Sequence, residues 1–186
     1  MVSRQMRQFT LLAHLVMVTA AGCGTAVDGE AEDDPVGEPT LAAGQKRCAN
    51  IIQEHDLAAL GYSSSSSQVF TDPFWRAPDP RFTWCLELVS SLNYRIRPYD
   101  LQSTKVMGAY ENSSNDYNVV LRSVLNSNSI WFIVPGVTPG TFRLQQSSTG
   151  RLLDAYTSGT RRAVTRSAQS DATQRWYIED VGCTCD

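Results

Sequence analysis

Three tryptophans recur along this chain at nearly constant spacing. Trp84 and Trp131 lie 47 residues apart, and Trp131 and Trp176 lie 45 residues apart. A tyrosine precedes each of them by 22, 21 and 20 residues; these are Tyr62, Tyr110 and Tyr156. Two columns that drift by one residue per copy indicate a unit repeated three times, and a period between about 20 and 50 residues is typical of repeat architectures.

The segments inside each repeat have the composition of strands. Each tryptophan begins or precedes an alternating apolar run, and a second apolar segment lies between the tyrosine and the tryptophan. Copies two and three open with further segments of this kind, Tyr94–Arg97 and Thr141–Leu144. Short runs rich in β-branched and aromatic residues, separated by Gly, Ser, Asn and Asp, predict strands, about four in each unit. Copy one leaves an alternative open, because Ile51–Leu60 also fits a helical turn.

A unit of four short strands cannot cover its own apolar face, so the three copies must share one core. We therefore predict an all-β fold, a single β-trefoil of three pseudo-repeats over residues 46–186. The expected repeats are about 46–92, 93–138 and 139–182, with the three recurring tryptophans as core residues.

The N-terminal residues predict export. Residues 1–22 combine the basic Arg4 and Arg7 with an apolar stretch too short to span a bilayer, as a signal peptide does. The stretch ends in Ala20-Ala21-Gly22-Cys23, which resembles a bacterial lipobox and predicts a lipid anchor on Cys23. The alternative is ordinary cleavage, an incidental cysteine and a secreted product. Residues 23–45, acidic and poor in apolar residues, predict a disordered linker, so the expected location is the bacterial cell envelope.

The charge and composition of the remaining chain exclude several classes of function. Residues 46–186 hold 14 basic and 13 acidic residues, which argues against nucleic acid as a partner. This part has one histidine, His55, and neither a metal-ligand spacing nor a phosphate-binding glycine loop. We therefore expect no enzyme activity, no metal and no cofactor, and contact with the membrane only through the anchor.

Four cysteines remain after Cys23, an even number that suits an oxidising compartment. Cys48 opens the predicted domain, Cys85 follows the first recurring tryptophan, and Cys183 and Cys185 close the chain. Because the termini of a closed threefold barrel meet, we predict that Cys48 and Cys85 bond to the C-terminal pair. The sequence does not decide which bonds to which.

Copy three resembles a repeat of the ricin-B-type lectins. It carries Leu153-Asp154 after the turn at Gly150, and a Gln-x-Trp motif at Gln174-Arg175-Trp176. Copies one and two retain only the tryptophan of that motif. The resemblance implies a sugar site built from an Asp, an aromatic platform on the next strand and polar residues before the Gln-x-Trp motif.

The resemblance assigns candidate sugar contacts to copy three alone. Asp154 stands at the acidic position, but the platform falls at about Arg166 or Ser167, and Thr173 stands where Asn is usual. Tyr156 is a substitute platform two residues beyond the Asp. The candidates are Asp154, Tyr156, Arg166, Thr173 and Gln174. Structural alternatives exist for each: Asp154 can cap its turn, and Gln174 can bond the backbone.

Two functions follow from the sequence. The first is a lipid-anchored, lectin-like module that binds a carbohydrate or a glycosylated partner through the third repeat. The second is a trefoil without sugar binding that serves as a protein-interaction, inhibitor or toxin-delivery subunit. Its contacts would lie in the loops, at Trp75 or at Arg161-Arg162.

Overall fold

The computed structural model describes residues 44–99 and 104–185. The predicted signal peptide, the lipid-anchor residue Cys23 and most of the predicted linker lie outside this range. Among the described residues, no helix is long and apolar enough to cross a membrane.

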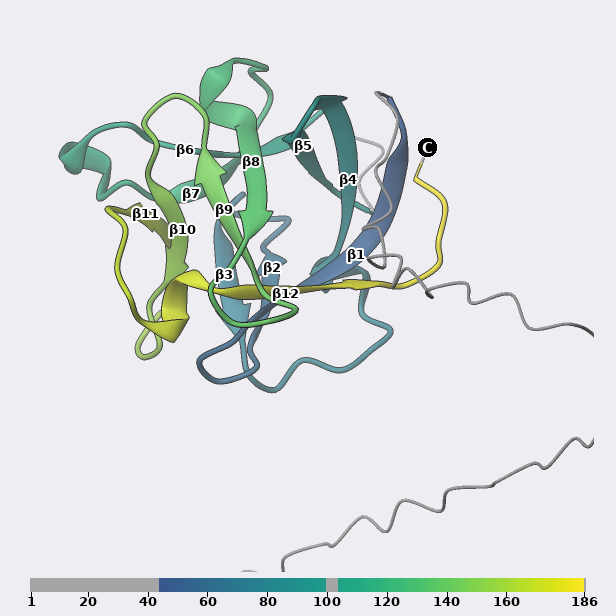
Figure 1. Ribbon diagram of the computed structural model, residues 1–186, viewed down its shortest axis with the longest axis horizontal. Coiled ribbons are helices and arrows are strands. Elements are labelled where there is room, and N and C mark those ends of the chain that lie inside the picture. Colours follow the sequence, from purple (N-terminus) through teal and green to yellow (C-terminus); the bar gives the residue numbers. More distant parts are fainter. Residues whose placement is uncertain (1–43, 100–103, 186) are drawn as a thin grey trace, which may run out of the picture. The chain divides into compact units, whose positions relative to one another are not determined.

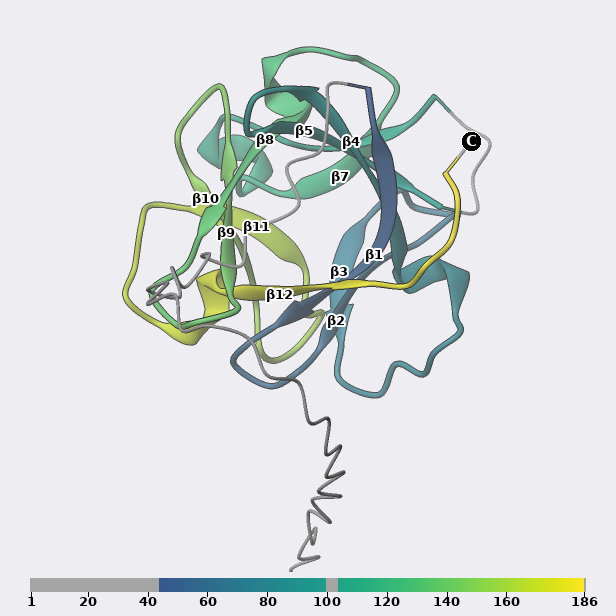
Figure 2. The ribbon, with the colours of Figure 1, turned by 45° about the vertical axis from the view of Figure 1, so that its right-hand side comes forward.

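The first and fourth strands of each repeat form a closed barrel of six strands. Pairing runs antiparallel from β1 through β4, β5, β8, β9 and β12 back to β1 (Figures 1 and 2). Their bounds are β1 (Lys46–Gln53), β4 (Thr83–Ser90), β5 (Asn93–Pro98), β8 (Ile130–Pro135), β9 (Phe142–Gln146) and β12 (Trp176–Asp180). Closure removes the free edges that a sheet of this size would otherwise expose.

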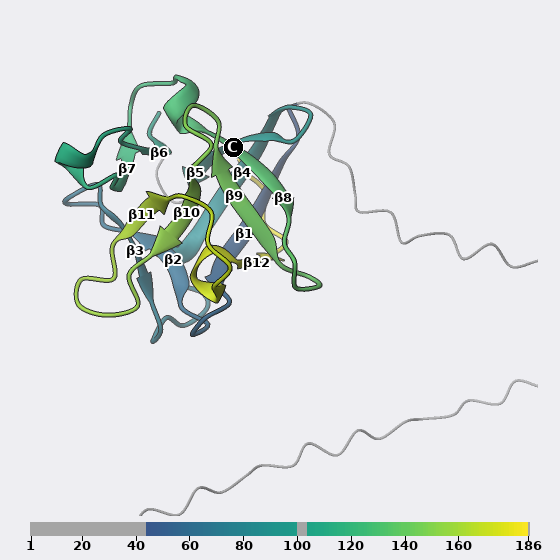
Figure 3. The same ribbon diagram turned by 60° about the vertical axis from the view of Figure 1, so that its left-hand side comes forward.

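The second and third strands of each repeat form a hairpin. The hairpins are β2 (Ala59–Tyr62) with β3 (Val69–Asp72), β6 (Val106–Ala109) with β7 (Val119–Arg122), and β10 (Leu152–Ala155) with β11 (Ala163–Arg166). Isolated bridges join the three hairpins in a triangle, Gln68 to Val120, Asn118 to Val164 and Phe70 to Arg162. The hairpins therefore support one another at one end of the barrel (Figure 3).

The three recurring tryptophans are fully buried in one hydrophobic core. Each indole Nε1 donates to a backbone carbonyl of the hairpin in its own repeat, Trp84 to Leu60 at 2.8 Å, Trp131 to Met107 at 2.9 Å and Trp176 to Leu153 at 3.2 Å. The same bond made three times confirms the predicted β-trefoil. Copy one begins with strand β1 rather than with a helical turn.

A short 3₁₀ turn precedes the fourth strand of each repeat. These turns are η1 (Pro80–Phe82), η3 (Ser127–Ser129) and η4 (Ala172–Gln174), and a further turn, η2 (Ser113–Asn115), lies between β6 and β7. A side-chain oxygen of Asp79, Asn126 or Asp171 accepts a backbone N–H at the start of each of the three. The capped turn places one residue next to the hairpin of its repeat, namely the residue two positions before the tryptophan. In the third repeat this residue is Gln174, one of the predicted site residues.

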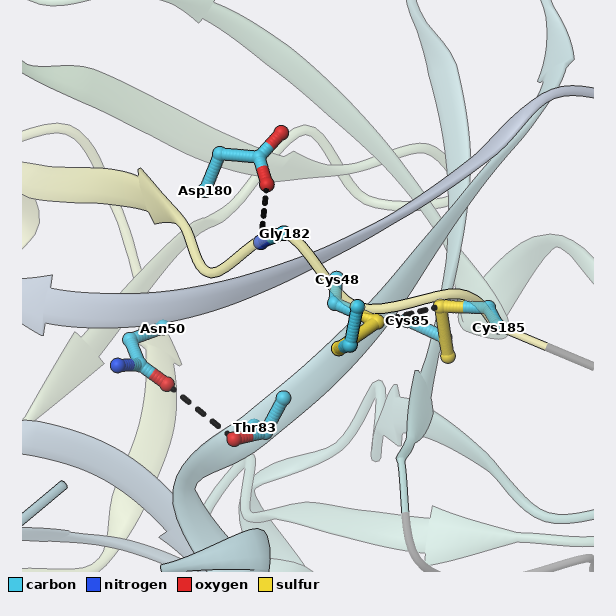
Figure 4. Close-up of a disulfide and its surroundings, with 8 residues drawn as sticks. Cys48, Asn50, Thr83, Cys85, Asp180, Gly182 and Cys185 are labelled. Atoms are coloured by element: carbon cyan, nitrogen blue, oxygen red, sulfur yellow. Dashed lines mark hydrogen bonds between the residues drawn. A yellow bond between two sulfur atoms is a disulfide. The ribbon is translucent and has the colours of Figure 1, made fainter. Parts of the chain in front are cut away.

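Two disulfides tie the C-terminal segment to the first repeat. β1 pairs with both β4 and β12, so the start and the end of the domain lie side by side. Cys48 bonds to Cys183 and Cys85 to Cys185, in agreement with the predicted use of the C-terminal pair. Figure 4 shows Cys48, Cys85 and Cys185 gathered where the C-terminal segment passes β1 and β4. The structure thus selects one of the connectivities that the sequence left open.

Candidate functional site

Asp154 occupies a position in β10 that the other two repeats fill with glycine. In each repeat the carbonyl that accepts the tryptophan N–H belongs to the residue just before this position. The equivalents of Asp154 are therefore Gly61 and Gly108. Within the three repeats, only the third offers a carboxylate here.

The carboxylate of Asp154 is fully buried and already hydrogen-bonded. Oδ1 accepts the backbone N–H of Ala155 at 2.7 Å. Oδ2 accepts from Gln174 Nε2 at 3.2 Å and from Arg166 Nη1 at 3.4 Å. A buried carboxylate needs such partners, so Asp154 orients Gln174 and Arg166.

Gln174 is the residue two positions before Trp176, and its side chain ties together the turn before β12. Nε2 donates to the carbonyl of Ser167 at 2.9 Å, and Oε1 accepts the backbone N–H of Gln169 at 2.7 Å. These are the backbone bonds expected of a structural glutamine. Gln174 is fully buried, so it holds Asp154 in place from the interior side.

Arg166, at the expected platform position, joins Asp154 to Tyr156. Its guanidinium carbon lies 4.6 Å from the centroid of the Tyr156 ring, and its side chain is 32% exposed. The Tyr156 hydroxyl lies 3.4 Å from Asp116, which also pairs with Arg162 at 3.0 Å. The surface above the buried carboxylate is therefore a stacked cation and ring rather than an open aromatic plate.

Thr173 does not join this cluster. Its hydroxyl donates to the capping carboxylate of Asp171 at 2.6 Å, and its carbonyl accepts from Gln53 Nε2 at 2.8 Å. The structure therefore brings together four of the five predicted residues, Asp154, Tyr156, Arg166 and Gln174, and uses Thr173 to close the turn.

In repeat one, a side chain fills the space that the third repeat gives to the carboxylate. A Cβ placed on Gly61 would lie 2.5 Å from Cε1 of Phe82, which stands at the position of Gln174. In repeat two, a Cβ on Gly108 would lie 3.2 Å from the hydroxyl oxygen of Ser129, at the same position. These sites hold no acidic group, as the sequence comparison of the repeats predicted.

A separate pocket of about 450 Å³ opens on the flank of repeat one. It is lined by Asn50, Trp75, Ala77, Pro78, Asp79, Pro80, Thr83, Tyr99, Val181 and Cys183. The sequence singled out Trp75 as a possible loop contact but missed Asn50, Thr83 and Tyr99. No local pattern marks them, because they come from β1, β4 and the residue after β5.

The ion pair between Asp79 and Arg81 lies at the pocket rim, and the pKa values of both groups are shifted. The Arg81 guanidinium hydrogen-bonds both carboxylate oxygens of Asp79, with the shortest contact at 2.7 Å, and lowers the pKa of that carboxyl below its usual value of 3.8. The same contact raises the pKa of Arg81. Both groups are therefore charged at neutral pH, and the rim carries no net charge from this pair.

The arginines proposed for a protein contact are engaged within the fold. Arg161 pairs with Asp56 and donates to the carbonyls of Thr71 and Thr157 at 3.2 and 2.6 Å. Arg162 pairs with Asp116. Both therefore join the third repeat to its neighbours.

One group of potential metal ligands occurs in the part of the chain that the structure describes. The Sγ atoms of Cys48, Cys85 and Cys185 lie within 4.8 Å of one another. All three are in disulfides, so none is available as a thiolate ligand.

Solved structures resemble this chain in fold. A designed threefold-symmetric protein, ThreeFoil, matches with a TM-score of 0.62 at 20% identity over 72% of this chain and 99% of its own. A Polyporus squamosus lectin bound to the epitope Neu5Aca2-6Galb1-4GlcNAc matches with a TM-score of 0.62 at 15% identity over 76% of this chain and 51% of its own. A mosquitocidal holotoxin matches with a TM-score of 0.62 at 17% identity over 76% of this chain and 18% of its own.

No protein-family model and no curated protein sequence matches the chain. The likeness is therefore one of fold, and the fold is the β-trefoil also found in ricin-B-type lectins. Because trefoils host unrelated functions, the function has to be argued from the sites.

Proposed function

We propose that this chain is a lectin-like module that binds a carbohydrate or a glycosylated partner through its third repeat. It shares its fold with a lectin bound to a sialylated saccharide. We further propose that Cys23 carries a lipid that anchors the module to the bacterial cell envelope, on the strength of the signal-like residues before it.

The arrangement of Asp154, Arg166 and Tyr156 carries the proposal. Asp154 uses one oxygen to hold Nη1 of Arg166, and the remaining guanidinium N–H groups donate to no residue that the structure describes. Arg166 therefore presents oriented donors beside the ring of Tyr156. A sugar supplies what this surface lacks, because its hydroxyl oxygens accept hydrogen bonds from a guanidinium.

In this arrangement Asp154 is a positioning residue and Arg166 is the contacting residue. Asp154 stands at the acidic position that the sequence predicted, but its buried oxygens act on the ligand only through Arg166. This division of roles differs from the direct acceptor role that the family resemblance implied.

A glycan array probed with the full chain tests the proposal. We expect binding to a subset of glycans, with an affinity in the millimolar range that weakens at least about tenfold in Arg166→Ala, which corresponds to the loss of one charge-assisted hydrogen bond. Asp154→Asn should weaken binding less, because its one oxygen can still accept from Gln174 and Arg166, although its Nδ2 then faces the Ala155 N–H. Glu111→Gln, which removes an exposed carboxylate elsewhere, is the matched control. Unchanged binding of every glycan on the array in Arg166→Ala would refute the assignment of the site.

A protein-interaction module is the second candidate function. It is favoured by the complete burial of Asp154 and by the 79% exposure of Phe74 in the loop after β3. A fold match to a mosquitocidal holotoxin is compatible with a delivery role. This candidate predicts an array without hits, and a partner whose binding survives Arg166→Ala and is lost in Phe74→Ser.

The lipid anchor has its own test. Cells grown with an alkyne-tagged fatty acid should label the wild-type chain but not Cys23→Ser, and the variant should move from the membrane fraction to the soluble fraction. Equal labelling of both chains, or a soluble wild-type chain, would contradict the anchor.

A further inference from the structure

The pocket on the flank of repeat one shares no residue with the third-repeat site. Four parts of the chain build it. They are the loop from Trp75 to Pro80, the polar pair Asn50 and Thr83 on β1 and β4, Tyr99 after β5, and the C-terminal segment at Val181 and Cys183. The bond between Cys48 and Cys183 holds the last of these against the barrel.

Aromatic and proline side chains form the walls of this pocket. Trp75 is held at its base, because its ring centroid lies 6.3 Å from that of Phe82 and its Nε1 lies 3.4 Å from the Leu57 carbonyl. Tyr99, the residue after β5, is 42% exposed. A ring that is held in place, as Trp75 is, loses little side-chain entropy when a ligand ring packs on it.

The polar pair at the pocket contains an unused donor. Asn50 is 5% exposed, and its Oδ1 accepts the Thr83 hydroxyl at 3.4 Å. Its Nδ2 donates to no residue among those the structure describes, and in Figure 4 this nitrogen is turned away from Thr83. A nearly buried amide donor that lines a pocket calls for an acceptor from the ligand.

The charge at the rim restricts the ligand further. Asp79 and Arg81 neutralise each other through several hydrogen bonds, so neither offers a free charge to a ligand. The other lining residues are uncharged. The pocket therefore suits a neutral ligand with a ring, an apolar group and one strong acceptor.

We infer that this pocket binds a neutral sugar that carries an N-acetyl group. The acetamide carbonyl supplies the acceptor for Asn50 Nδ2, and its methyl group suits the apolar surface of Ala77, Pro78 and Pro80. The apolar face of the pyranose suits Trp75 and Tyr99. A volume of about 450 Å³ lies within the range of small-molecule sites.

Two matched oligosaccharides test the inference on the unchanged full chain with its disulfides intact. Chitotriose carries an acetamide on each ring, whereas cellotriose carries a hydroxyl in its place. We expect calorimetric titration to give millimolar binding of chitotriose and at least about tenfold weaker binding of cellotriose, because one hydrogen bond and one methyl contact are lost.

Single substitutions show whether chitotriose binds in this pocket or at the third-repeat site. Trp75→Ala should weaken chitotriose binding by about tenfold or more, and Asn50→Asp should remove the preference over cellotriose, since Asp keeps the Thr83 bond but lacks the donor. Arg166→Ala should bind chitotriose as the wild type does, which separates this pocket from the third-repeat site. Thermal unfolding shows whether each variant is folded.

Three results would overturn the inference. They are equal affinity for the two oligosaccharides, no binding of chitotriose, and chitotriose binding that survives Trp75→Ala but is lost in Arg166→Ala. Because the comparison of sugars needs no substitution, an unfolded Asn50→Asp variant leaves the test intact.

Discussion

At the scale of single residues, the three repeats differ most at two facing positions. The first position directly follows the residue whose backbone carbonyl accepts the tryptophan N–H. The second position lies two residues before that tryptophan in the sequence. The third repeat pairs Asp154 with Gln174, whereas the first pairs Gly61 with Phe82. The large ring of Phe82 requires that the facing residue lack a Cβ, so the two positions are coupled in the first repeat.

We predict that Gly61→Ala destabilises the domain by about 1–3 kcal/mol, because the new methyl would overlap the buried ring of Phe82. In Gly61→Ala combined with Phe82→Leu the loss should be smaller than the sum of the single losses. Urea unfolding of the four chains measures this as a double-mutant cycle. Additive losses would show that the two positions are independent.

Tyr62 is the buried member of the recurring tyrosine column. Its side chain is 0% exposed, and its hydroxyl has no hydrogen-bond partner among the described residues. An unpaired buried hydroxyl is costly, so Tyr62→Phe should leave the free energy of unfolding unchanged or raise it by about 1 kcal/mol. Tyr110 and Tyr156 lie instead against arginines at the surface. A clear loss of stability in Tyr62→Phe would reveal a partner for the hydroxyl.

At the scale of elements, the same backbone hydrogen bond joins the hairpins at three equivalent places. Ser67, Tyr117 and Arg161 lie two residues before the third strand of their repeats and have positive φ values of 57°, 49° and 50°. Their carbonyls accept N–H groups of the next repeat, from Leu121, Thr165 and Thr71. The left-handed backbone conformation directs each carbonyl away from its own hairpin and toward the next repeat. The three hydrogen bonds therefore link the three hairpins in a closed cycle.

We predict that Ser67→Val destabilises the domain by about 1–3 kcal/mol, because a β-branched residue resists positive φ. Ser67→Gly is the matched control and should cost much less, although it also loses the bond from Lys105. Thermal unfolding of both variants checks the difference. Equal losses in the two variants would assign the effect to the side chain rather than to the backbone.

At the scale of the whole molecule, the barrel closes by joining its two ends. β1 lies between β4 and β12, and the disulfides continue this closure beyond β12 with separations of 135 and 100 residues. Bonds across such long stretches restrict the unfolded chain strongly. They also fix the C-terminal wall of the pocket on repeat one.

We predict that Cys48→Ser with Cys183→Ser lowers the free energy of unfolding by about 2–4 kcal/mol and abolishes binding at the pocket. Cys85→Ser with Cys185→Ser should cost a similar amount of stability but retain more binding, since Cys85 and Cys185 do not line the pocket. Denaturant unfolding and titration with chitotriose measure the two effects. Peptide mapping under non-reducing conditions should recover both bonds in the wild-type chain. Identical chitotriose binding in the two double variants would show that binding at the pocket does not depend on the Cys48–Cys183 disulfide.

The fold was predictable from the sequence, because the tryptophan column records one buried contact that every repeat makes in the same way. The tyrosine column marked the repeat length, although its members lie in different surroundings. The pairing of the strand cysteines with the C-terminal pair followed from the closed barrel. The candidate site was only partly predictable. The resemblance named Arg166 together with Asp154 and Gln174, but it did not predict that Arg166 covers a buried Asp154, and it expected a sugar contact from Thr173, which instead closes the turn.

The sequence alone determined a threefold β fold with one acidic position in its third repeat, because hydrophobic periodicity and repeat spacing are local properties of the chain. The tertiary structure decided that Asp154 is buried beneath Arg166, which cysteines bond, and that Asn50, Trp75, Tyr99 and Val181 line one pocket. These features depend on side chains brought together from distant segments, and no spacing along the chain encodes which groups meet or how deeply they are covered.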